Sequence, residues 1–149
     1  MALRLTLLLS IALTLLCGET AAARSSSQSV WSGLVVANNV DKPDAMPAEI
    51  SRLEGTLKEL FGYNQFTVIG QSRKALQTGD EDWLASSKFF SLHVHAENKT
   101  DASYLLNLQL FQENKLLLET EAKLSQSSPL VIKGPQVGNG QLLLLLVLQ

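Results

Sequence analysis

The chain has 149 residues, with 12 Lys and Arg against 14 Asp and Glu, so its formal net charge is −2. This length suits a single domain. The basic residues are not clustered, and nucleic-acid binding needs clustered Lys and Arg, so we expect no nucleic-acid partner. Cys17 is the single cysteine and lies near the N-terminus, which leaves neither a disulfide framework nor a cysteine nucleophile for the rest of the chain.

The first 23 residues have the pattern of a secretory signal peptide. Arg4 precedes an apolar run over 5–16, and Ala21 and Ala23 form the small-residue cleavage pattern. The run is too short for a membrane-spanning helix, which needs about 20 apolar residues, so we expect no transmembrane segment after cleavage. The sequence therefore predicts an exported protein, periplasmic or secreted, and the plain cleavage site with no disulfides favours a bacterial host.

Cys17 raises the alternative of a lipoprotein. A lipidated cysteine normally follows a small residue, and Leu16 stands at that position. We therefore expect cleavage near Ala23 and a flexible, Ser- and Gln-rich lead-in over 24–29. A single β-rich domain is expected over 30–149.

The first elements of that domain are a strand, a loop and a helix. Residues 30–37 are rich in β-branched and aromatic side chains, which favours a strand, and a polar loop follows over 38–46. Pro47 opens a helix that Gly62 ends. Glu54 and Lys58 form a favourable i,i+4 pair. The apolar stripe of this helix consists of Ile50, Leu53, Leu57, Leu60 and Phe61.

From Tyr63 onward the hydrophobic period changes to two. Strands are expected over 66–70, 88–97, 104–110 and 116–124, and short polar turns join the last three into an antiparallel meander. The segment 78–80 is expected to be a turn, and the acids at 80–82 are interpreted as a solvated loop. Asn98 begins a glycosylation sequon on an expected turn, which a eukaryotic host alone would use.

The C-terminal part is expected to form a hairpin. A short strand over 129–133 is followed by a Gly-rich connection over 134–140 and a last strand over 141–148. The last strand is apolar on both faces. It is therefore predicted to be a central strand, covered by the meander core on one side and by the helix on the other.

These elements predict an α+β fold. It is mainly an antiparallel β-sheet of about seven strands with one amphipathic helix packed on it. The alternative is a β-sandwich of two sheets in which the helix covers one open end.

One pattern could bind a metal. His93, His95 and Glu97 alternate along an expected strand, so their side chains point the same way, and two imidazoles with a carboxylate can hold a divalent cation. The alternative is an ordinary exposed polar strand face. No Gly-x-Ser-x-Gly elbow and no phosphate loop occurs, so no cofactor is expected and a non-enzymatic protein is favoured.

A second pattern could bind a partner. Phe89, Leu105, Phe111 and Leu117 fall outside the predicted core face of the meander. Together they would form an apolar patch on its outer face, and such patches mark interaction surfaces. The alternative is that a second sheet or the helix covers them.

The order of features resembles a group of uncharacterised exported bacterial proteins. The shared features are a helix ending in Leu-Phe-Gly-Tyr over 60–63, the segment Phe-x-Val-Ile-Gly over 66–70, Ile-Lys-Gly-Pro over 132–135, and a Leu-rich last strand. The resemblance covers most of the expected domain. It implies no known activity and no functional residues.

Three functional hypotheses follow. The favoured one is a non-enzymatic interaction module that presents a sheet face or edge to a protein partner in the cell envelope. The second is a small-ligand carrier with a pocket between helix and sheet. The third is a metal-dependent exported enzyme that uses the His93, His95 and Glu97 strand face.

Overall fold

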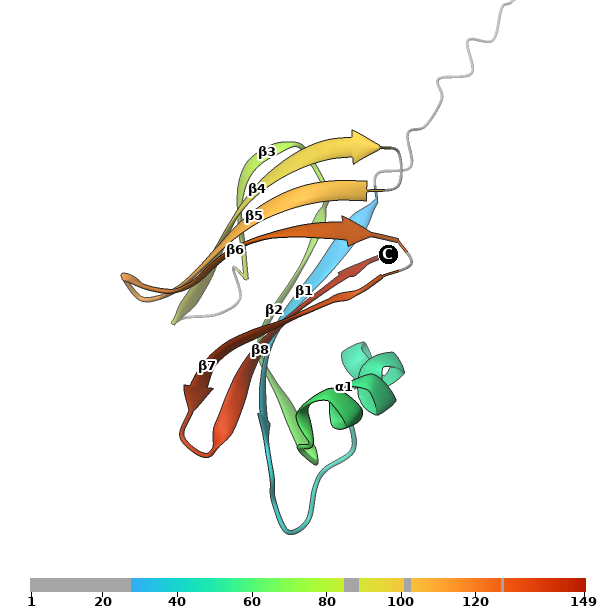
Figure 1. The fold of residues 1–149 in the computed structure, drawn as a ribbon, viewed down its shortest axis with the longest axis vertical. Helices are drawn as coiled ribbons and strands as arrows, with labels where there is room; N and C mark the ends of the chain where they lie inside the picture. The colour runs from blue at the N-terminus through green and yellow to red at the C-terminus, as the bar shows by residue number, and fades with distance from the viewer. Residues whose placement is uncertain (1–27, 85–88, 101–102, 127) are drawn as a thin grey trace, which may run out of the picture.

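Two four-stranded antiparallel sheets face each other, and one helical segment packs on the outside of one of them (Figure 1). The computed structural model of the protein describes residues 28–84, 89–100, 103–126 and 128–149. The first sheet, here called sheet A, has the order β2-β1-β8-β7, and sheet B has the order β3-β4-β5-β6. The predicted mainly antiparallel α+β fold with one helix is confirmed. It has the two sheets of the alternative, but the helix packs on a face of sheet A and does not cover an open end.

The bounds of the elements follow the chain. Sheet A contains β1 (Ser29–Asn38), β2 (Gln65–Ala75), β7 (Leu130–Val137) and β8 (Gly140–Leu148). Sheet B contains β3 (Gly79–Trp83), β4 (Phe90–Thr100), β5 (Ser103–Gln112) and β6 (Lys115–Ser125). The helical segment between β1 and β2 consists of the 3₁₀ helix η1 (Ala48–Leu53) and the α-helix α1 (Glu54–Phe61).

The central strand β8 separates two hydrophobic cores. Leu142, Leu144 and Leu146 pack between the two sheets, whereas Leu143 and Leu145 pack under the helical segment. Successive side chains of a strand point to opposite faces, so a strand that is covered on both faces must be apolar at every position. The expectation that β8 is a central strand covered on both sides is confirmed.

The helical segment begins and ends as expected but changes its pitch. Pro47 stands before η1, and Gly62 at φ 66° ends α1 by donating its N–H to the Lys58 carbonyl over 2.9 Å. The first turns are 3₁₀, with three residues per turn instead of 3.6, and this rotates the later residues about the axis. Leu60, which the sequence predicted to lie in the apolar stripe, is consequently 63% exposed.

The structure has one more strand than predicted, β3. The segment Gly79–Trp83 pairs with β4, so the acids at 80–82 lie in a strand and the solvated-loop interpretation was wrong. Its Gly, Asp and Glu residues have low intrinsic preference for strands. The strand is held in place because Trp83 and Leu84 are buried in the core between the sheets.

Irregular pairing moves several side chains from their predicted faces. The β1–β2 register shifts near Leu34, which places Gly70 opposite Leu34 and not on the face of Phe66 and Val68. Strand β7 continues through 134–135, which the sequence predicted to be a connection, and the register with β8 shifts there. Strand β4 likewise continues through Asn98, at a predicted turn.

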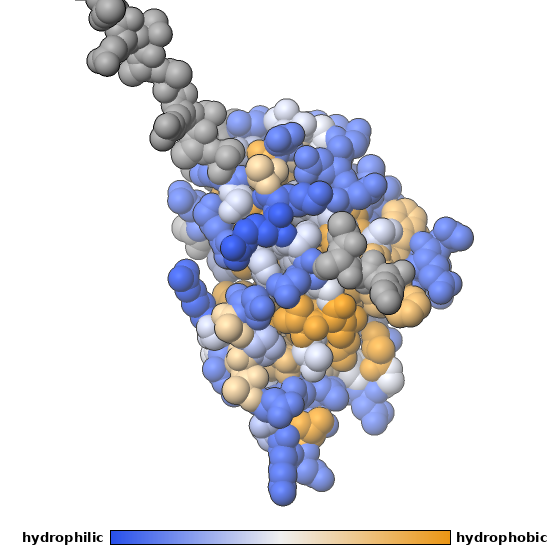
Figure 2. Space-filling view, turned by 180° about the vertical axis from the view of Figure 1, so that it is seen from behind, coloured by the Kyte–Doolittle hydropathy of each residue, from blue (hydrophilic) through white to orange (hydrophobic). Residues whose placement is uncertain are grey.

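The predicted signal peptide, and the lead-in up to residue 27, lie outside the described residues. Within the described part of the chain, no helix is both long enough and apolar enough to cross a membrane. On the side that Figure 2 shows, hydrophilic side chains cover most of the upper half and a hydrophobic patch lies lower down.

Candidate functional site

The outer face of sheet B carries the residues that the sequence singled out. The inner face is apolar: Leu92, Val94 and Ala96 of β4 lie in the core between the sheets. Alternation along β4 therefore turns His93, His95 and Glu97 toward solvent. The structure places these three side chains on one strand face, and each of them is about half exposed.

Strand pairing extends this face into two straight rows of polar side chains. In the first row, Asp82 pairs with His93 and continues through Gln109 to Glu119. In the second, Asp80 pairs with His95 and continues through Asn107 to Glu121. Each row therefore crosses all four strands in the order carboxylate, imidazole, amide, carboxylate. We call them the two polar rows.

Hydrogen bonds and short contacts tie neighbouring members of each row together. Nδ1 of His93 lies 3.0 Å from Oδ1 of Asp82, and Nδ1 of His95 lies 2.9 Å from Oδ1 of Asp80. A carboxylate only accepts hydrogen bonds, so the two imidazoles donate through Nδ1. In the first row, Gln109 Nε2 donates to Glu119 Oε1 over 3.0 Å.

The negative charge of the two polar rows is not balanced by lysine or arginine in the described part of the chain. Asp80, Asp82, Glu119 and Glu121 have no Lys or Arg nitrogen within 4.0 Å among the described residues. Their neighbours within the rows are amides and imidazoles, which satisfy hydrogen bonds without supplying a full positive charge unless the imidazoles are protonated. The four carboxylates therefore add up to an acidic surface.

The outer face as a whole concentrates the acidic residues of the chain. Among the residues whose side chains are described, it holds five acidic residues, with Glu97 as the fifth, and one basic residue, Lys123. The net charge of the whole chain is only −2, so the rest of the molecule carries a small net positive charge. Charge is thus distributed unevenly between this face and the remainder.

The three predicted metal ligands are close to one another but are not arranged around a common point. Glu97 Oε1 lies 3.8 Å from His95 Nε2, and His93 Nε2 lies 3.6 Å from Asp80 Oδ1. Within the described part of the chain, no group of three or more His, Cys, Asp or Glu side chains is arranged to hold a metal ion. Metal binding at His93, His95 and Glu97 stays a prediction.

The four predicted patch residues do not form one surface. Phe89 is 62% exposed and precedes the first residue of β4, so it has no partner in the register with β5. Leu105 lies six residues from Phe111 along β5, about 20 Å away, with the polar rows between them. Leu117 packs against the core between the sheets, and Leu116, 44% exposed, pairs with Phe111 in its place.

The sequence did not predict that β3 and β6 contribute carboxylates to the polar rows. The local pattern predicts a loop at Asp80 and Asp82, and it marks Glu119 and Glu121 only as the polar positions of an alternating strand. The short turn at 113–114, which joins β5 to β6, was the available signal. It sets the pairing of Gln112 with Lys115, but an extra residue in β6 beyond the turn shifts the register by one, and only this shift places Glu119 opposite Gln109.

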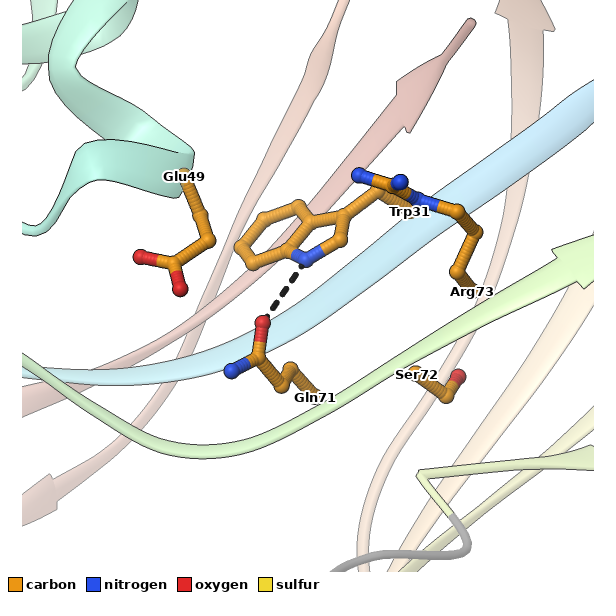
Figure 3. A pocket seen from close by; sticks show the side chains of 5 residues that line it. All are labelled: Trp31, Glu49, Gln71, Ser72 and Arg73. Carbon is orange, nitrogen blue, oxygen red and sulfur yellow. Dashed lines mark hydrogen bonds between the residues drawn. The ribbon is translucent and has the colours of Figure 1, made fainter.

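A hollow lies on the other side of the molecule, between η1 and sheet A. Two adjoining cavities of about 410 and 590 Å³ share Glu49 and Arg73 in their linings. Trp31 belongs to the first, and its Nε1 donates to Gln71 Oε1 over 3.0 Å (Figure 3).

No arrangement for nucleophilic catalysis is present in the part of the chain that is described. Ser32 and Ser72 hydrogen-bond each other over 2.7 Å, and neither His93 nor His95 contacts a serine hydroxyl. Comparisons with protein-family models, with curated proteins and with solved structures found no match to this chain. The chemistry of its own surfaces is therefore the basis for assigning a function.

Proposed function

We propose that this protein is an exported, non-enzymatic interaction module that binds a basic segment of a protein partner on the outer face of sheet B. The observation that carries the proposal is the pair of polar rows, whose four carboxylates have no Lys or Arg nitrogen within 4.0 Å among the described residues. The export part rests on the sequence of residues 1–23.

The shape of this surface suits an extended peptide. Each row has a carboxylate at either end and hydrogen-bonding groups between them. Neighbouring members of a row are about 4.8 Å apart, the distance between strands, and the two rows are about 7 Å apart, the distance between alternate residues of a strand. A Lys or Arg side chain of the partner gains a charge-assisted hydrogen bond to each carboxylate it reaches. Opposite surface charges also accelerate association and make it sensitive to salt.

The apolar residues beside the rows suit such a partner as well. Phe111 lies two residues after Gln109 on β5, and Leu105 lies two residues before Asn107, so both are on the face of the polar rows. Both are only partly buried. A partner that carries apolar side chains on either side of its basic residues would contact both. We expect Phe111→Asp to weaken binding without unfolding the protein.

Titration with an octalysine peptide tests the proposal. His93 and His95 are the two histidines of the chain, so in untagged protein every imidazole NMR signal reports on the two polar rows. We expect octalysine to shift both signals saturably, and to bind more weakly as salt rises from about 0.05 to 0.5 M. Octaglutamate at the same concentration should leave both signals in place.

Two double variants test whether octalysine binds the polar rows specifically or responds only to the net charge of the protein. Glu119→Gln with Glu121→Gln removes two charges from β6, and we expect about tenfold weaker octalysine binding. Asp41→Asn with Glu59→Gln removes the same charge from exposed positions elsewhere and should change binding less than twofold. Equal losses in the two double variants, or no shift of either imidazole, would show that the rows are not the binding surface.

The metal hypothesis has its own test on the same residues. Stoichiometric metal in purified protein, or a higher melting temperature with added Zn²⁺ that His95→Gln abolishes, would support a metal site at His93, His95 and Glu97. Octalysine binding that survives chelation would keep the interaction proposal separate from it.

A further inference from the structure

The hollow between η1 and sheet A exists because the helical segment covers only part of the sheet. Arg73, Trp31 and Val147 lie in one row across β2, β1 and β8, on the face that the helical segment packs against. Ile50 of η1 is fully buried on this face, whereas Arg73 at the edge of the sheet is exposed. The two cavities described above open along this row.

Two arginines line this hollow without an acidic partner in the described part of the chain. Arg52 of η1 and Arg73 of β2 both line the larger cavity, and neither has a carboxylate oxygen within 4.0 Å among the described residues. Glu49 is the one acidic side chain of the lining. Figure 3 shows Glu49 and the Arg73 guanidinium on opposite sides of the Trp31 ring. The lining side chains therefore carry a net positive charge.

The remaining lining combines an apolar wall with Gln126 and Gln149. Leu53 comes from η1, Val147 and Leu148 from the end of β8, and Pro129 from the segment before β7. Ligand sites commonly combine such an apolar wall with a few charged groups in a space of about 300–1,000 Å³, which the two cavities match. A guanidinium is a planar fork that matches a carboxylate in two parallel hydrogen bonds.

We infer that this hollow binds a small amphiphilic carboxylate, with its carboxylate on Arg73 and Arg52 and its apolar chain along Leu53 and Val147. The site is independent of the outer face of sheet B, because it lies on the opposite layer of the molecule. Its ligand has the opposite charge to the basic partner proposed above. Failure of one proposal therefore leaves the other standing.

Decanoate is the probe, with decanol and decylammonium as matched ten-carbon ligands. We expect saturable decanoate binding by calorimetry, with decanol at least tenfold weaker because it lacks the charge. Arg73→Gln should weaken decanoate binding about tenfold. Lys74→Gln is the control: it removes the same charge from the next residue of β2, which points to the other face of the strand, and should change binding less than twofold.

A second pair of variants tests the location of the decanoate site without changing the charge of the protein. Ala48 is exposed and lines the larger cavity, so Ala48→Trp should fill the hollow and abolish decanoate binding. Thr56→Trp adds the same ring to an exposed position on α1 and should leave binding intact. Circular dichroism checks that each variant is folded, and Arg52→Gln replaces Arg73→Gln if the latter unfolds.

Three results would overturn the inference. The first is no decanoate binding at all. The second is equal affinity for decanoate and decanol, with no effect of Arg73→Gln, which would make the hollow a purely apolar site. The third is preferential binding of decylammonium, which would mean that Glu49 and not the arginines selects the ligand.

Discussion

At the scale of single residues, position 33 requires a glycine because the ring of Trp31 occupies the space of a Cβ. The indole of Trp31 lies over the backbone of Gly33, and a Cβ at this position would lie 2.7 Å from Cζ2 and from Cζ3 of that ring. Trp31 is only 3% exposed, and its Nε1 is hydrogen-bonded to Gln71, so the ring cannot simply turn away. A side chain at residue 33 therefore has to displace a buried aromatic group.

We expect Gly33→Ala to lower the free energy of unfolding by about 1–3 kcal/mol, because overpacking forces buried groups to shift. Gly55→Ala is the matched control. Gly55 is exposed in α1, a Cβ added there would meet nothing within 4 Å, and alanine favours a helix by about 0.5–1 kcal/mol. Urea unfolding of both variants measures the difference; a neutral Gly33→Ala would mean that the ring is not held in place.

A buried glutamine stabilises the irregular part of β7. Gln141 is 6% exposed, and its Nε2 donates to the carbonyls of Gly134 and Pro135, where the register between β7 and β8 shifts. Both carbonyls belong to the two residues of β7 that have no register partner in β8. The Gln141 side chain of β8 thus supplies hydrogen-bond donors to the part of β7 where the register shift interrupts the ladder.

Gln141→Leu keeps a similar volume but removes the donor. We expect it to cost about 1–3 kcal/mol of unfolding free energy, since it leaves partly buried carbonyls without a partner. Gln136→Leu, at an exposed position of β7, should stay within about 0.5 kcal/mol. Thermal unfolding of the two variants would contradict this interpretation if both lost the same stability.

At the scale of elements, one extra residue in β6 reverses the faces of the strand on which Leu116 and Leu117 lie. Opposite the Leu110–Phe111 step, Leu118 and Leu116 are the paired residues and Leu117 is the additional one. A bulge of this kind reverses which side chains point inward on one side of it. Leu117 therefore packs against the core between the sheets and Leu116 is 44% exposed.

This exchange predicts opposite sensitivities at neighbouring positions. We expect Leu117→Asn to cost about 1–3 kcal/mol, because it places an amide against the core, and Leu116→Asn to cost less than about 0.5 kcal/mol. Chemical denaturation of both variants tests the bulge directly. Strict alternation along β6 would produce the reverse order.

At the scale of the whole molecule, β8 couples the two cores. Leu144 packs between the sheets, and the next residue, Leu145, packs under the helical segment; both are fully or almost fully buried. Because both cores share one strand, neither can lose its packing without affecting the strand that the other needs. We infer a single cooperative unfolding unit for the described layers.

We expect Leu144→Ala and Leu145→Ala each to cost about 2–5 kcal/mol, as large-to-small changes in a core do. Each variant should unfold in one transition that near-UV and far-UV circular dichroism report at the same temperature. Leu60→Ala, at a 63% exposed position, is the control and should stay close to the parent protein. Two separate transitions would show that the cores are independent.

The sequence determined those features that depend on local pattern. Alternation placed His93, His95 and the inner residues of β4 on their faces, Gly62 ended the helix, and the continuous apolar run of β8 indicated burial on both sides. Each follows from the period of a strand or from the conformational freedom of one residue.

The tertiary structure decided the features that depend on partners distant in the chain. The acidic segment at 80–82 became a strand because β4 pairs with it and Trp83 anchors it, although its own residues disfavour strands. The same pairing created the two polar rows, and the bulge in β6 turned Leu117 away from the predicted apolar patch. Register and bulges arise from contacts between strands, and no period within a single segment encodes them.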